Sequence, residues 1–175
     1  MVPDIDLQLR VVIKALREVV APAVDPDNRL AIEQFHLSLA TLAFVEARLP
    51  LVRQRVRREL KNAMALAEAA LAVIKGGAAP ITAEVVAARA ALGDADVDTG
   101  ELEAHKSRLL AAVSAAVNAS PDAATDRALA KAVVAASKPQ FDLVRAWGLP
   151  SGFEPDPAQV PPLDDLISGK AINQQ

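Results

Sequence analysis

The sequence predicts an all-α fold: an antiparallel bundle of five or six helices around one buried central helix, with a proline-rich extended C-terminal tail. Two observations indicate this fold. The stretch from about residue 26 to 49 is apolar on all sides, with no charged residue between Leu37 and Val45, and such a helix is normally covered by neighbours. Hydrophobic residues make up 52% of the chain and aromatic residues only 3%, which suits closely packed helices better than sheets.

The central helix has recognisable ends. Asp25 is the expected N-cap, with Pro26 at the first helical position, where its missing N–H costs no hydrogen bond. Pro50 ends the pattern, because proline restricts the residue before it. Two alternatives remain at Pro50: a third helix begins there, or one long helix kinks. We favour the break, because an unbroken rod would be too long for a domain of this size.

The helices on either side show apolar stripes at helical spacing. The first is expected from Asp4 to about Ala21, and the third ends at the stop signal Gly76–Gly77. The apolar positions expected on the first helix are Ile5, Leu9, Val12, Ile13, Leu16, Val19 and Val20. Those on the third helix are Val52, Val56, Leu60, Ala63, Ala67, Leu71 and Ile74.

Two further helices are marked by caps. Thr82 is the expected cap of a short helix over Ala83–Leu92 that stops at Gly93. Asp98, with Glu101 three residues later, resembles a capping box that opens a helix to about Val117.

The last predicted helix begins after Ser120–Pro121 and is interrupted at Pro139. Phe141, Val144 and Trp147 then continue its apolar face as far as Gly148. We therefore expect one bundle domain over residues 1–149 and a proline-rich extension over 150–175, with a single helical turn near Leu163–Ile167.

Composition narrows the class of protein. The 175 residues are enough for one domain with a substantial core. The absence of cysteine excludes disulfides, zinc–thiolate sites and a cysteine nucleophile. The first residues are acidic and do not resemble a signal peptide, and a net charge of −3 gives no general attraction to nucleic acid. We expect a cytoplasmic protein.

An acidic loop is the first candidate site. Side chains two residues apart can converge on a hard cation, and the carboxylates concerned are Asp94, Asp96, Asp98 and Glu101. An EF-hand loop, however, requires glycine at its sixth position and glutamate at its twelfth, where this chain has Thr99 and His105. We favour an acidic connection whose last aspartate caps the next helix.

The central helix carries the second candidate site. Glu33 and His36 form an E-x-x-H pattern, which in di-iron bundles occurs twice. No second copy is present, because the residue three positions before His105 is Leu102 and not a glutamate. A hydrogen-bonded histidine is the favoured interpretation, and a small-molecule pocket near Glu33, His36 and Thr41 is the alternative.

A basic cluster is the third candidate site, for an anion or a protein partner. Its members are Arg53, Arg57, Arg58 and Lys61. A solvated face is the favoured interpretation. Arginines near the positive end of a helix are unfavourable without a compensating anion, which keeps the binding hypothesis open.

Enzyme signatures are absent from the sequence. There is no G-x-G-x-x-G, Walker-type loop, G-x-S-x-G elbow or H-E-x-x-H motif. We expect neither catalysis nor a cofactor.

The layout resembles an uncharacterised all-helical bacterial family found near acyl-CoA dehydrogenase-like and phosphotransferase-like proteins. The residues that carry the resemblance are Leu16 to Pro22, the run ending Ala47-Arg48-Leu49, and the stretch His105 to Pro121. The resemblance implies an accessory role in acyl-CoA metabolism and transfers no functional residue.

The leading functional hypothesis is a non-catalytic interaction protein that self-associates as a dimer, with another protein as the alternative partner. It rests on the all-round apolar central helix and the uncompensated basic cluster. A ligand- or metal-binding bundle is the second hypothesis. Neither a membrane nor nucleic acid is an expected partner.

Overall fold

The computed structural model describes residues 4–74, 78–119 and 122–169. Helices account for 84% of the chain, and no strand occurs within those ranges. The predicted all-α fold is therefore confirmed. The chain forms two compact units, unit 1 from Met1–Val52 with Gly148–Glu154, and unit 2 from Arg53–Trp147 with Pro155–Gln175.

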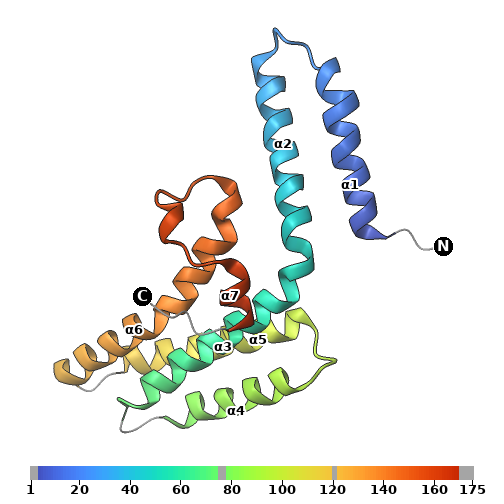
Figure 1. Ribbon diagram of the computed structural model, residues 1–175. Coiled ribbons are helices and arrows are strands. Elements are labelled where there is room, and N and C mark those ends of the chain that lie inside the picture. The colour runs from blue at the N-terminus through green and yellow to red at the C-terminus, as the bar shows by residue number, and fades with distance from the viewer. Residues whose placement is uncertain (1–3, 75–77, 120–121, 170–175) are drawn as a thin grey trace. The chain divides into compact units, whose positions relative to one another are not determined.

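Unit 1 is a helical hairpin. Helix α1 (Ile5–Ala15) is capped by Asp4 and continues through a π-helical turn (Leu16–Val20) and a 3-10 turn (Ala21–Ala23). A short connection leads to α2 (Arg29–Arg48), which lies beside α1 (Figure 1). The predicted extent of the first helix is thus confirmed, although its last turns depart from α-helical bonding.

Few side chains are covered where α1 and α2 meet. Ile13, 6% exposed, is the one buried residue among the described residues of unit 1. Leu9 and Leu16, one turn to either side of Ile13, are half-buried. Arg10 and Glu46 form an ion pair between the two helices, with 3.3 Å between Nε and Oε1. The hairpin is therefore joined along one narrow stripe.

The prediction that residues 26–49 form a buried central helix is wrong. No residue of α2 is buried, and Leu37 is 53% exposed. Within its unit, α2 contacts α1 and the short 3-10 turn Leu149–Ser151, which leaves much of its circumference uncovered. The cap also differs, because Asn28 accepts from the N–H of Ala31 while Asp25 caps only the preceding turn.

Helix α3 (Val52–Leu71) begins only three residues after α2 ends. The intervening residues, Leu49–Leu51, form a 3-10 turn that contains Pro50. The α-helical ladder is therefore interrupted at Pro50, and no loop separates the two helices.

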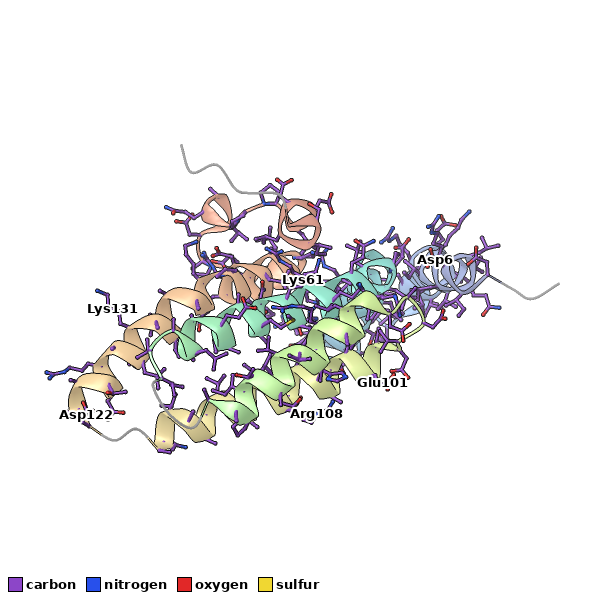
Figure 2. All side chains as sticks on the ribbon, turned by 90° about the horizontal axis from the view of Figure 1, so that it is seen from below. Asp6, Lys61, Glu101, Arg108, Asp122 and Lys131 are labelled. Carbon is purple, nitrogen blue, oxygen red and sulfur yellow. The ribbon has the colours of Figure 1, made fainter. Side chains whose placement is uncertain are left out.

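Unit 2 contains the core, and α3 is its principal helix. α3 packs with α4 (Ala79–Gly93), α5 (Thr99–Asn118) and α6 (Ala123–Gly148). Helices α3, α4 and α5 run alongside one another in both views (Figure 1, Figure 2). The fully buried large side chains, from all four helices, are Leu60, Ile81, Leu102, Leu109, Leu129 and Leu143. The predicted stripe of the third helix is confirmed at Val56, Leu60, Ala63 and Ala67.

The helix ends in unit 2 agree unevenly with the predictions. Asp98 caps α5, since its Oδ1 accepts from the N–H of Glu101 over 2.7 Å. Helix α4 starts at Ala79, so Thr82 lies inside the helix, where its hydroxyl donates to the carbonyl of Ala78. The predicted signals Gly76–Gly77 and Ser120–Pro121 lie outside the described residues.

Helix α6 continues through Pro139 without interruption, so the predicted break is wrong. Its apolar face is also shifted from the prediction: Leu143 and Ala146 are buried, whereas Phe141 and Val144 are 67% and 51% exposed. The tail is not simply extended, because it forms a 3-10 turn (Pro157–Gln159) and α7 (Leu163–Ser168), the single turn expected there.

Candidate functional site

The hairpin of unit 1 carries a series of exposed apolar side chains. We call this series the hairpin surface; on α1 and the turns after it, its members are Ile5, Leu7, Val11, Val12, Val19 and Val20. On α2 and the turn that follows, they are Leu30, Leu37, Val45 and Leu49. A large exposed apolar patch marks a binding surface in soluble proteins.

One helical stretch of the described chain, Arg29–Leu71, is long and apolar enough in part to cross a bilayer. Length and composition alone identify it, and a soluble core helix or a signal sequence passes the same test. None of the residues in its apolar window is buried. This stretch begins with α2, so it contributes to the hairpin surface.

The residues predicted to bind a ligand on α2, Glu33, His36 and Thr41, are all exposed. The hydroxyl of Thr41 donates to the carbonyl of Leu37 within its own helix, over 2.8 Å. The His36 ring lies edge-on to Phe35, 6.0 Å between centroids. The structure therefore gives these side chains local roles on an exposed helix.

Two members of the predicted basic cluster donate hydrogen bonds to backbone carbonyls. Arg53 donates to the carbonyl oxygens of Val97 (2.8 Å) and Ala95 (2.7 Å), and Arg57 donates to that of Leu92. These carbonyls lie at and just beyond the C-terminal end of α4, where helical carbonyls lack partners and cations are favourable.

Three of the four predicted basic residues meet near the tail. Arg57, Arg58 and Lys61 line a shallow recess with Ile167 and Ser168 of the α7 segment, and the Arg58 guanidinium approaches Gly169. Arg57 therefore belongs both to this recess and to the end of α4, whereas the hydrogen bonds of Arg53 are to the segment at the end of α4.

The acidic loop does not gather its carboxylates. Asp94 accepts from the N–H of Asp96 over 2.8 Å, and Asp98 caps α5. Within residues 4–74, 78–119 and 122–169, no three histidine or carboxylate side chains are placed to hold a metal ion. The favoured prediction of a capping loop agrees with this geometry.

One buried polar site of unit 2 was not identified from the sequence. Glu59 of α3 is 5% exposed and accepts from Arg55 (2.7 Å) and from Lys106 of α5 (2.5 Å). The guanidinium carbon of Arg55 also lies over the ring of Trp147, 4.4 Å from the ring centroid. Burial by itself would raise the pKa of Glu59, but the hydrogen bonds and charges of Lys106 and Arg55 outweigh it and lower that pKa below its ordinary value.

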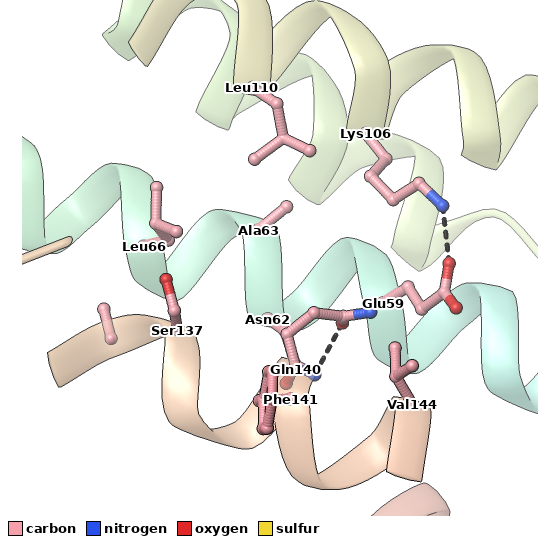
Figure 3. A pocket seen from close by; sticks show the side chains of 11 residues that line it. Glu59, Asn62, Ala63, Leu66, Lys106, Leu110, Ser137, Gln140, Phe141 and Val144 are labelled. Atoms are coloured by element: carbon pink, nitrogen blue, oxygen red, sulfur yellow. Dashed lines mark hydrogen bonds and ion pairs between the residues drawn. The ribbon is translucent and has the colours of Figure 1, made fainter. Parts of the chain in front are cut away.

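Beside Glu59 lies a cavity of about 350 Å³ between α3, α5 and α6 (Figure 3). Its apolar lining includes Ala63, Leu66, Leu110, Phe141 and Val144. Its polar end is formed by Glu59 and Lys106 together with an amide pair, in which Asn62 donates to Gln140 over 3.1 Å. Binding sites for small molecules are commonly mainly apolar cavities with a few polar groups.

Sequence reasoning missed this site although one signal was present. Glu59 lies between Val56 and Leu60 on the stripe of α3 that was predicted to be buried. A carboxylate on such a stripe requires a cationic partner, and Arg55 one turn earlier is in position to provide it.

The fold and these surfaces define an all-α protein with one unit that is an exposed helical hairpin and another that is a helical core with a cavity beside Glu59. The chain matches no family model, no curated protein and no solved structure. The resemblance drawn from its sequence therefore stays a prediction.

Proposed function

We propose that this chain is a non-catalytic interaction protein that associates with a second copy of itself through the hairpin surface. The observation that carries the proposal is that α2, with 20 residues, has none buried. Exposed apolar side chains on α1 add to the same surface. Two antiparallel helices joined along one stripe are a marginal unit, whereas two hairpins together make a four-helix bundle with an interior.

The size of the surface fits a second copy. A helix of 20 residues is about 30 Å long. With a neighbour at about 9 Å, one face of the hairpin offers about 600 Å². Two copies would bury about 1,200 Å² together, which is the lower limit of a specific interface.

The charges of the hairpin favour a protein partner over a lipid interior. Arg10 forms an ion pair with Glu46 between the two helices. It forms a second one within α1, where its Nη2 lies 3.8 Å from Oδ2 of Asp6. Each charged side chain at the centre of a bilayer costs about 3 kcal/mol on insertion scales. Both signs of charge are present, so self-association does not bring together surfaces of one sign.

The test is the mass of the full chain over a concentration series, by native mass spectrometry and analytical ultracentrifugation. We expect a concentration-dependent dimer, and we expect Leu37→Glu to leave a folded monomer. Val86→Glu is the matched control, because Val86 is 60% exposed on α4 of unit 2.

Three results would contradict the proposal. The first is a monomer mass at every concentration up to about 1 mM. The second is an equal loss of dimer with Val86→Glu. The third is a wild-type monomer that floats with phosphatidylcholine vesicles and loses this binding in Leu37→Glu, which would assign the hairpin surface to a membrane.

A further inference from the structure

The cavity between α3, α5 and α6 keeps apolar side chains accessible that the core does not use. On α6, Leu143 and Ala146 are buried, but Phe141 and Val144 remain 67% and 51% exposed at the cavity. Leu66 and Leu110 form the opposite walls, from α3 and α5 (Figure 3). An apolar guest would cover these four side chains, which favours binding in proportion to the area removed from water.

Hydrogen-bond donors remain at the polar end. The Lys106 ammonium has three N–H groups, of which one is directed at Glu59. Gln140 uses its oxygen to accept from Asn62, which leaves both N–H groups of its amide for another acceptor. Among the described residues, the one hydrogen bond of Lys106 is to Glu59 and the one hydrogen bond of Gln140 uses its oxygen. The head of a guest should therefore present acceptor oxygens.

The charges around Glu59 sum to a positive excess. Lys106, in the cavity lining, and Arg55, outside it, contribute two positive charges around the one negative charge of Glu59. The lowered pKa of Glu59 keeps its carboxylate ionised at neutral pH, so one positive charge is left over. A monoanion is the complement of that excess.

The volume limits the size of the guest. A water molecule, which has one non-hydrogen atom, occupies about 30 Å³ in the liquid, and we take this as the volume for each non-hydrogen atom of a guest. A cavity of about 350 Å³ then holds about 12 non-hydrogen atoms.

We propose that this cavity binds an amphiphilic carboxylate, with its head group at Lys106 and Gln140 and an apolar body of about nine carbon atoms between Leu66, Leu110 and Phe141. The proposal does not depend on self-association, because it concerns side chains of unit 2 only.

The test uses decanoate, below the concentration at which it forms micelles, with decanol as an uncharged probe of the same length. Isothermal titration of the full chain should show saturable binding of one decanoate per chain. Ala136→Phe, which places a ring in the cavity, should weaken binding at least about tenfold. Ala135→Phe is the matched control, because Ala135 is exposed on the same helix outside the cavity lining.

A second variant tests the head group without filling the cavity. Lys106→Met should weaken decanoate about tenfold and decanol less than about threefold. Lys131→Met, at an exposed position that projects from α6 into solvent (Figure 2), should change neither.

Several outcomes would overturn the assignment. One is the absence of saturable decanoate binding up to about 1 mM; another is equal weakening of decanoate and decanol in Lys106→Met. Wild-type affinity in Ala136→Phe combined with a loss in Leu37→Glu would place the amphiphile on the hairpin surface instead. Retained decanoate binding in a chain that is monomeric throughout would contradict self-association while supporting the cavity.

Discussion

Lys106 of α5 donates to the buried carboxylate of Glu59 on α3, and this ion pair joins two helices of the core at the polar end of the cavity. The two residues are 47 positions apart in the chain. Because Arg55 contacts the other oxygen of the same carboxylate, Glu59 is held from two sides.

Removing the Glu59 carboxylate should destabilise unit 2. Glu59→Ala leaves Arg55 and Lys106 together without a counter-charge, and breaking a buried pair in this way costs about 3 to 5 kcal/mol. Because these cations are 32% and 24% exposed, water partly replaces their partner, and we expect about 2 to 3 kcal/mol. Urea unfolding measures the loss. A change below about 0.5 kcal/mol in Glu59→Ala, or an equal change in exposed Glu103→Ala, would contradict this prediction.

The same carboxylate should contribute to acid sensitivity. A pKa that is lower in the folded chain than in the unfolded chain adds stability above the ordinary value of 4.5, and this stability is lost as the pH falls through the lower, folded value. The difference in unfolding free energy between wild type and Glu59→Gln should therefore be constant from neutral pH down to about 4.5 and shrink below it. Urea unfolding at successive pH values measures it. If the difference in unfolding free energy grew on acidification, the pKa of Glu59 would be raised in the folded chain and not lowered, and the prediction would be wrong.

Arg57 should stabilise the C-terminal end of α4. Arg57→Ala removes the bond to the carbonyl of Leu92, and a hydrogen bond from a charged donor is worth about 1.5 to 3 kcal/mol. We expect a loss of about 1 to 2 kcal/mol, because Arg57 is only half-buried, with faster amide hydrogen exchange in residues 91–97. Lys61→Ala is the control, since Lys61 is exposed on the same helix. Unchanged exchange in Arg57→Ala would show that the bond does not support this end.

Leucines on α3 and α2 should respond very differently to truncation. Leu60 is fully buried, so Leu60→Ala should cost about 3 to 5 kcal/mol through lost burial and the cavity left behind. Leu37 is 53% exposed, and Leu37→Ala should cost less than about 1 kcal/mol when measured in dilute solution, where the chain is expected to be monomeric. Equal losses would restore α2 as the centre of the core.

The candidate site was predicted less well than the fold. The basic and acidic residues were noticed as clusters, but Arg53 and Arg57 bind carbonyls near the end of α4 and Asp98 caps α5. Sequence spacing shows which side chains share one helix face. It does not show which carbonyls or carboxylates another helix brings to that face, so the pairs Glu59–Lys106 and Asn62–Gln140 could not be found from it.

The sequence by itself determined the all-α class, the stripe of α3 and the Asp98 cap, because helical period and capping are local properties of neighbouring residues. Only the tertiary structure decided which helix forms the core. The sequence predicts apolar helices both around Leu37 and around Leu60. Whether such a helix is buried depends on how many neighbouring helices cover it. In unit 2 three long helices surround Leu60, whereas in unit 1 one long helix lies beside Leu37.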